Sequence, residues 1–240
     1  MSQNQWGQNS GWNNQQRAPG QTINQFSQQH TIAANKVLRN TYLMLSLTLL
    51  FSAVTAGISM TMNSLPLNPI LTLIIYFGLF FAVSKTKDSP WGLILTFALT
   101  GFLGFTIGPI LNFYITNFSN GSELILLALG STALIFFGLT IISLNPNRDF
   151  SKMGSFLTIG AIVALVAIVA NLFLQIPALA LAISVIVSLI SGALIMWQTN
   201  MIVRGGETNY IMATVTLYIS ILNIFLTVLQ FLGMFAGNRN

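Results

Sequence analysis

Long apolar runs separated by short polar or Pro/Gly breaks dominate the chain from Lys36 onward. A helix that crosses a hydrocarbon core of about 30 Å needs roughly 20 apolar residues, and seven runs reach or approach that length. They are Thr41–Met62, Pro69–Ser84, Pro90–Tyr114, Leu124–Leu144, Met153–Phe173, Ala178–Val203 and Asn209–Phe235. The second run is short, and its start can be extended back to Leu65. Because the runs lack the strict alternation of barrel strands, they predict an all-α integral membrane protein with seven transmembrane helices.

The composition is that of a membrane protein, with 54% hydrophobic and 5% charged residues, against about 25% charged residues in ordinary soluble domains. The acidic residues are Asp88, Glu123, Asp149 and Glu207, and none lies well inside an apolar run. Ionised groups at membrane depth are the usual means of proton relay and ion gating. The chain is therefore expected to work through packing, neutral polar groups and its termini, with the lipid bilayer as its surroundings.

The positions of Lys and Arg predict how the helices are oriented. With seven helices, one side of the membrane receives Arg17, Lys36, Arg39, Lys85, Lys87, Arg148, Lys152 and Arg204, and the other side receives only Arg239. The positive-inside rule then places the N-terminus in the cytoplasm and the C-terminus outside, which is the periplasm in a bacterium. The net charge of +5 is thus a topology signal and gives no reason to expect nucleic acid.

The segment before the first run is rich in Gln and Asn and has no apolar stretch of the kind found in signal peptides. Such a composition cannot bury enough apolar area to fold. We expect residues 1–35 to form a disordered cytoplasmic tail and residues 36–240 to form the transmembrane domain. The tail is either a tolerated extension or a handle for a partner or a protease.

Polar and small residues inside the runs recur at steps of three and four, which places them on single helix faces. The last run carries Asn209, Ala213, Thr216, Ser220, Asn223, Thr227 and Gln230; the sixth carries Ser184, Ser188, Ser191 and Gln198; the third carries Thr96, Thr100, Gly104, Gly108 and Asn112; and the first carries Thr48, Ser52, Thr55 and Ser59. In lipid, such faces let helices approach closely and hydrogen-bond. Packing is therefore the simplest interpretation of each stripe.

The last stripe holds two amides, Asn223 and Gln230, which is more than packing requires. We expect its polar face to point into the bundle toward the sixth helix, where it either packs or lines a narrow wet cavity. In the third run, Pro109 removes a helical hydrogen bond and predicts a bend.

No catalytic or metal-binding set can be assembled from these residues. The chain has no Cys, and its single His, His30, lies in the tail. Intramembrane proteolysis needs paired carboxylates, a serine with a base, or paired His ligands for zinc. The sequence predicts a non-enzymatic protein with no metal site and no cofactor.

The stretch Gly104-Phe-Thr-Ile-Gly-Pro109-Ile-Leu, followed by Ala128-Leu-Gly-Ser-Thr-Ala-Leu-Ile-Phe136, resembles the signature of the Bax inhibitor-1 (TMBIM) family. Its residues include Gly104, Gly108, Pro109, Thr132 and Ala133. Lys36–Tyr42, Ala170–Leu179 and Gly205–Tyr210 resemble the bacterial YccA branch of that family. The resemblance covers nearly all of the chain from Lys36 to Phe235. It implies a fold in which six helices surround a central seventh.

The resemblance implies two activities. Some members leak calcium through a pore controlled by a carboxylate pair on the sixth and seventh helices, and the matching positions here are Gln198 and Ser220. Neither side chain ionises, and calcium prefers carboxylate oxygens, so the chain departs from that pattern. Members of the YccA branch are implied to bind the membrane-anchored AAA protease FtsH and to restrain its attack on other membrane substrates.

Two hypotheses follow for this chain. The first is a non-enzymatic multi-pass protein of the bacterial inner membrane that binds and modulates FtsH. The alternative is a calcium or ion leak channel with a neutral gate, through a polar pathway formed by Gln198, Thr216, Ser220, Asn223 and Gln230.

Overall fold

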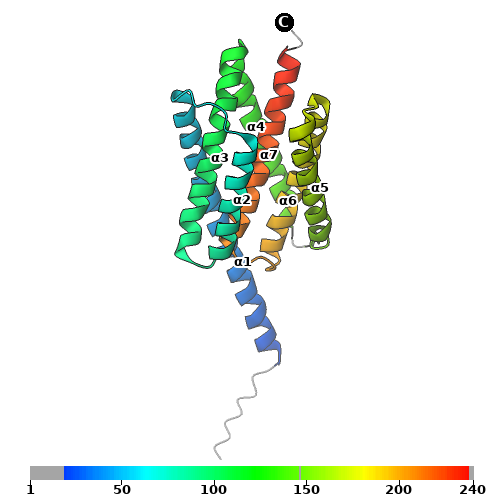
Figure 1. Ribbon diagram of the computed structural model, residues 1–240. Coiled ribbons are helices and arrows are strands. Elements are labelled where there is room, and N and C mark those ends of the chain that lie inside the picture. Colours follow the sequence, from blue (N-terminus) through cyan, green and yellow to red (C-terminus); the bar gives the residue numbers. More distant parts are fainter. Residues whose placement is uncertain (1–18, 146, 238–240) are drawn as a thin grey trace, which may run out of the picture.

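The computed structural model describes residues 19–145 and 147–237, which form seven helices and no strand (Figure 1). The helices are α1 (Pro19–Thr61), α2 (Pro69–Thr86), α3 (Pro90–Asn117), α4 (Gly121–Ser143), α5 (Met153–Leu174), α6 (Pro177–Val203) and α7 (Tyr210–Gly237). All seven are long and apolar enough to cross a membrane, the candidate span of α1 beginning at Ile32. The predicted all-helical fold with seven spans is confirmed. Each predicted run lies in one helix, and six of them match their helix apart from a few residues at the ends, whereas α1 begins well before the predicted start at Thr41.

The helices α2, α3 and α6, like α1, begin at a proline. A proline there costs no hydrogen bond, because the first N–H groups of a helix have no partner within it. The prolines of α2, α3 and α6 are Pro69, Pro90 and Pro177. At the start of α2, the Asn68 side chain accepts a hydrogen bond from the N–H of Ile70 at 2.9 Å. The possible earlier start at Leu65 is therefore wrong, because Asn68 is in an extended conformation and caps the helix.

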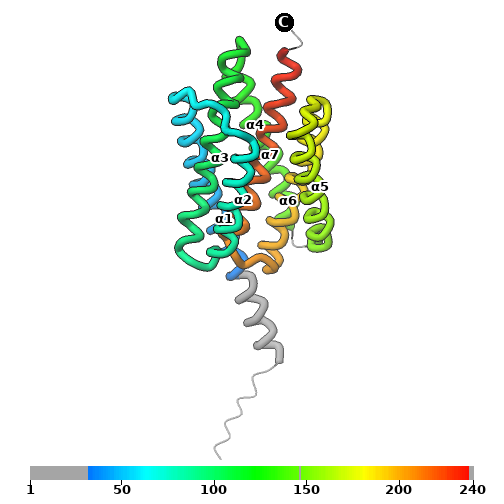
Figure 2. Tube along the Cα trace, viewed as in Figure 1, coloured from blue at the N-terminus to red at the C-terminus, as the bar shows by residue number. Residues whose placement is uncertain are grey.

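The helix α1 is continuous from Pro19, so it includes part of the segment predicted to be a disordered tail. Residues 1–18 lie outside the described residues. Both the disorder of residues 1–35 and the domain boundary at residue 36 stay predictions. The candidate span of α1 starts at the end of the bundle opposite to the end of α7 (Figure 2).

The last helix is the most buried of the seven. In the most apolar part of α7, 61% of the residues are buried, against 6% in α2 and 11% in α5. It packs against α1, α3, α4 and α6, whereas α2 packs mainly on α3 and α5 on α6. The helix that carries the longest polar stripe is thus the one best shielded from lipid. The complete ring of six helices around α7 stays a prediction.

The glycines of the family signature hold α3 against α1. A Cβ atom added at Gly104 would lie 2.6 Å from the Ser52 hydroxyl oxygen, and one added at Gly108 would lie 2.9 Å from the carbonyl oxygen of Ala56. Both distances are too short for a real carbon atom. The stripes predicted on the first and third runs therefore face each other, and their role at this contact is close packing. The helix α3 continues through Pro109 to Asn117, and the predicted bend stays a prediction.

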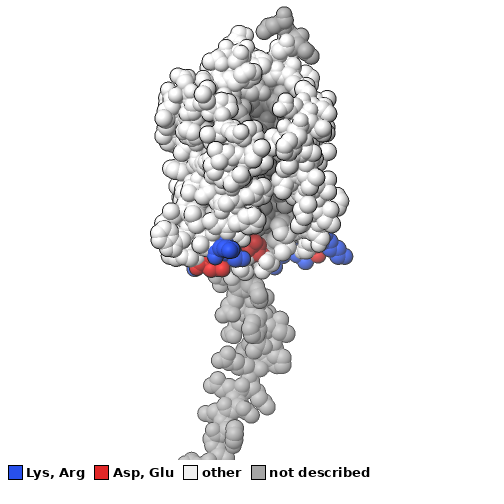
Figure 3. Space-filling model, viewed as in Figure 1, with Lys and Arg blue, Asp and Glu red and all other residues white. Residues whose placement is uncertain are grey.

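Charged side chains gather at the end of the bundle from which α1 extends (Figure 3). Three connections are tied together there: Arg204 after α6 pairs with Asp149 after α4 at 3.3 Å, and the Asn209 amide before α7 donates to the Asp88 carboxylate after α2 at 2.8 Å. The N–H of Ser151 donates to Asp149 and, with a smaller contribution from Arg204, holds the pKa of that carboxyl below its ordinary value. The described Lys and Arg residues of the predicted charged side lie at this end, whereas Arg17 and Arg239 lie outside the described residues. The side of the membrane on which this end lies stays a prediction.

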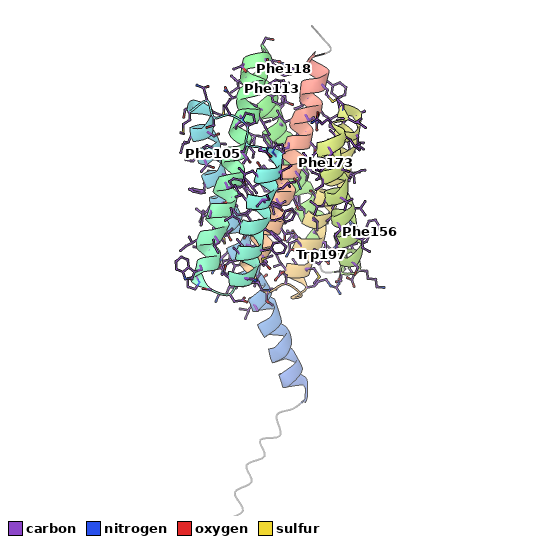
Figure 4. The ribbon with its side chains drawn as sticks, viewed as in Figure 1. Phe105, Phe113, Phe118, Phe156, Phe173 and Trp197 are labelled. Atoms are coloured by element: carbon purple, nitrogen blue, oxygen red, sulfur yellow. The ribbon has the colours of Figure 1, made fainter. Side chains whose placement is uncertain are left out.

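Aromatic side chains mark the lipid-facing surface and the other end of the bundle. Phe156 and Phe173 of α5 point away from the other helices (Figure 4) and are 73% and 75% exposed. At the end of α3, the ring of Tyr114 stacks on Phe118 with 5.3 Å between the ring centroids. Aromatic rings at this level are typical of a membrane interface.

The α1–α3 contact makes a stability prediction. Gly104→Ala or Gly108→Ala should destabilise the protein by about 1–3 kcal/mol, because the added methyl group forces α3 away from α1. Gly138→Ala is the matched control, since nothing lies within 4 Å of a Cβ atom at Gly138. Unfolding of the purified variants in detergent measures the difference. Equal stability of Gly104→Ala and Gly138→Ala would show that the contact is not tight.

Candidate functional site

The polar face of α7 meets the polar face of α6. The Asn223 amide donates to the Ser191 hydroxyl at 3.1 Å. One turn further along α7, the Thr227 hydroxyl lies 3.0 Å from the carbonyl oxygen of Ser184 and 2.9 Å from that of Asn223. The predicted direction of the stripe, toward the sixth helix, is confirmed.

Other polar side chains of the stripe bond within their own helix. The Thr216 hydroxyl donates to the Met212 carbonyl at 3.0 Å, and the Ser220 hydroxyl donates to the Thr216 carbonyl at 2.8 Å. Ser220 is 1% exposed, while Gln230, near the far end of the stripe, is half-buried. Bonds of this kind satisfy a hydroxyl without any partner helix, so Thr216 and Ser220 need no further ligand.

Gln198 on α6 differs from these residues. Its side chain is 2% exposed, and its amide nitrogen has no hydrogen-bond partner among the described residues. A buried donor without an acceptor costs free energy, so packing alone does not account for a glutamine here. Within the same part of the chain, no hydrogen bond joins Gln198 to Ser220, the other position that the resemblance matches to the gate.

The signature residues lie elsewhere in the bundle. Gly104, Gly108 and Pro109 belong to α3, where the two glycines contact α1. On α4, Thr132 is buried and donates its hydroxyl to the Ala128 carbonyl at 2.7 Å, whereas Ala133 is exposed. Thr132 and Ala133 line a groove between α1 and α4. The signature and the polar stripe are thus two separate features.

Sequence reasoning missed Tyr218, which is 1% exposed on α7. Its hydroxyl donates to the Thr100 carbonyl of α3 at 3.1 Å and lies 2.6 Å from the Ser52 hydroxyl of α1. A phenol donates only one proton, so Ser52 donates to Tyr218. This tyrosine joins three helices from outside the predicted stripe. Its signal in the sequence was a tyrosine in the middle of an apolar run, since a buried hydroxyl there needs a partner.

Asn200 was also missed. This fully buried residue accepts a hydrogen bond from the N–H of Phe150 at 3.2 Å, and its amide nitrogen lies 2.9 Å from the Arg148 carbonyl and 3.3 Å from the Ser143 carbonyl. It fixes the end of α6 to the α4–α5 connection. An amide near the end of an apolar helix gives no sign of which connection it binds.

The chemistry of the α6–α7 contact is that of neutral hydroxyl and amide groups. No group of three or more His, Cys, Asp or Glu side chains occurs in the described part of the chain. Hydroxyls and amides hold helices together or bind neutral and hydrated ligands, and they do not titrate near neutral pH. The arrangement therefore fits helix association or a neutral pathway.

The family model described as Inhibitor of apoptosis-promoting Bax1 matches residues 34–237. The chain belongs to this Bax inhibitor-1 family. The matched residues extend through all seven helices. This agrees with the resemblance of the stretches in α3 and α4 to the family signature.

Several bacterial proteins are similar to this chain. The chain is 48% identical over 202 residues to the Modulator of FtsH protease YccA of Escherichia coli strain K12, a match that covers 84% of this chain and 91% of that protein. The figures are the same for the Inner membrane protein YccA of E. coli O6:H1. An uncharacterized membrane protein of Vibrio cholerae is 40% identical over 213 residues, covering 88% of this chain and 95% of that protein. The chain is a close homologue of YccA.

The Asn223–Ser191 hydrogen bond predicts a measurable coupling between α6 and α7. Asn223→Ala and Ser191→Ala should each destabilise the protein, and the double variant should cost less than the sum by about 0.6–1.7 kcal/mol. Unfolding of the four proteins in detergent gives this coupling energy. Strictly additive effects would mean that the two side chains do not interact.

Proposed function

We propose that this chain is a non-enzymatic multi-pass protein of the bacterial inner membrane that binds and modulates the protease FtsH. The observation that carries the proposal is the 48% identity, over 91% of its length, to the E. coli protein named as a modulator of FtsH. A match of 202 residues is long enough to include most of the helices and the connections between them.

The physical character of the bundle supports this role. Its interior is held together by neutral hydrogen bonds, while α2 and α5 present apolar side chains to the membrane, including Phe81, Phe156 and Phe173. A surface of this kind suits contact with the membrane segment of a protease, because helices in lipid associate through packing. Bond cleavage by a hydroxyl also requires a base such as His, and no His lies in the candidate spans.

The proposal includes an orientation. The connections after α2, α4 and α6 carry Lys87, Arg148, Lys152 and Arg204, and those after α1, α3 and α5 carry no Lys or Arg. The positive-inside rule assigns the charged end to the cytoplasm. The start of α1 would then lie on the cytoplasmic side and the end of α7 on the periplasmic side.

Affinity purification tests the proposal. The full chain, tagged at its C-terminus and purified from native membranes, should retain FtsH. Deletion of residues 1–30 should reduce this retention if the tail is the handle, because chain termini are preferred sites of attack by proteases. A chain whose tail is replaced by a Gly/Ser segment of equal length is the matched control. Absence of FtsH both in detergent and after cross-linking in membranes would refute the proposal.

The alternative function is an ion leak with a neutral gate, and the observation that favours it is the unpartnered amide of Gln198. In liposomes that contain the purified protein, we expect no calcium flux that changes between roughly pH 6 and pH 8, because the spans hold no group that titrates there. A flux that is lost in Asn223→Leu and in Gln198→Leu would favour the channel. Acid-dependent flux would contradict the argument from the missing carboxylates.

A further inference from the structure

An apolar groove runs along the outside of the bundle between α1 and α4. Leu49 of α1 and Leu129 of α4 belong to its walls, and Tyr218 and Phe225 of α7 lie at its floor. Ala133 and Phe137, which also line it, are exposed. The groove therefore opens sideways, toward the lipid that surrounds the helices.

The groove extends over almost the full depth of the membrane. On α1 its lining begins at Tyr42 and ends at Met60, and that stretch of helix is about 27 Å long. The hydrocarbon core of a bilayer is about 30 Å thick. An occupant of the groove therefore lies parallel to the helices, within the hydrocarbon core of the bilayer.

Small residues line the groove and leave space between its walls. Ala53 and Gly57 of α1 share its lining with Ala133 of α4, and nothing lies within 4 Å of a Cβ atom placed at Gly57. The groove has a volume of about 530 Å³. This space is elongated and lined almost entirely by apolar side chains, which suits a flexible hydrocarbon chain.

A positively charged side chain, that of Arg39, lies at the charged end of this groove. Arg39, Tyr42, Ser46, Leu49 and Ala53 follow one another on α1 at steps of three and four, so they share one helix face. Arg39 is exposed, and it makes no ion pair in the part of the chain that the structure describes. A guanidinium group binds phosphate through two parallel hydrogen bonds. This face of α1 therefore has a side chain that can bind phosphate at the charged end of the groove and apolar side chains further along it.

We propose that the α1–α4 groove is a binding site for an anionic phospholipid. One acyl chain lies in the groove between Leu49 and Leu129, and the headgroup phosphate lies at Arg39. The lipid belongs to the leaflet at the charged end of the bundle. This site is independent of the protease, because it requires only the protein and lipid.

Filling the groove tests the site for the acyl chain. The purified full chain is mixed in detergent with phosphatidylglycerol, and the bound lipid is counted by native mass spectrometry. Gly57→Leu should lose the retained lipid, while Gly138→Leu should keep it, because both glycines have open space beside them and only Gly57 lines the groove. Equal retention by the two variants would overturn the proposal.

Removing the cation tests the site for the headgroup. The wild-type protein should prefer phosphatidylglycerol over phosphatidylcholine with the same acyl chains by about fivefold, the effect of one basic residue near the membrane surface. Arg39→Gln should abolish this preference, and Lys85→Gln, which removes a charge at the same end from α2, should not. Equal binding of both lipids to the wild type would refute the role of Arg39.

A photoactivatable lipid locates the chain without any variant. Phosphatidylglycerol with a diazirine in its acyl chain should cross-link to α1 between residues 42 and 60 and to α4 between residues 125 and 137. Cross-links spread evenly over α2 and α5 would overturn the proposal. So would a Gly57→Leu protein that keeps its lipid but no longer retains FtsH, since the occupant would then be a partner helix. Loss of lipid with FtsH retained would support the lipid site and leave the proposed function intact.

Discussion

Hydrocarbon supplies no hydrogen-bond partner, so a polar group between the two membrane surfaces must find its partner inside the protein. This constraint explains why α7 is the most buried helix. Its Thr227 and Asn223 bond to α6, and its Tyr218 bonds to α1 and α3. The outer helices α2 and α5 carry few such groups, so they can face lipid and still be stable. The distribution of neutral hydroxyls and amides thus determines which helices lie inside the bundle.

Hydropathy and proline positions were sufficient to predict the seven helices, because the length of each apolar run and residues such as Pro69 and Pro90 act locally. The stripe of α7 also pointed correctly toward α6. The specific partners were not predictable, since periodicity defines a helix face without saying what it meets. Tyr218 and Asn200 show this limit, because their bonding partners lie fifty or more residues away in the chain. The family resemblance marked Gln198 as a position matched to the gate, but only the structure shows that its buried amide nitrogen has no partner among the described residues.

The residues that resemble the family signature and those that form the α6–α7 contact have separate tasks. Gly104 and Gly108 bring the backbones of α1 and α3 together, which leaves α1 in a fixed position relative to α4. Thr132 and Ala133 then border the open side of that arrangement. The signature residues therefore shape the contact between α1 and α3 and the groove beside it. The α6–α7 hydrogen bonds instead stabilise the interior. A bundle divided in this way can change its surface contacts without breaking its core.

The helix α2 is both short and little buried. Its 18 residues span about 27 Å, whereas the 28 residues of α3 and of α7 span about 42 Å. In a bilayer whose hydrocarbon core is thicker than the length of α2, the bilayer must become thinner beside this helix, while the long helices adapt by tilting. The resulting elastic deformation is confined to one flank of the molecule. Hydrophobic mismatch therefore favours thin regions of membrane next to α2 and gives neighbouring proteins a preferred side of approach.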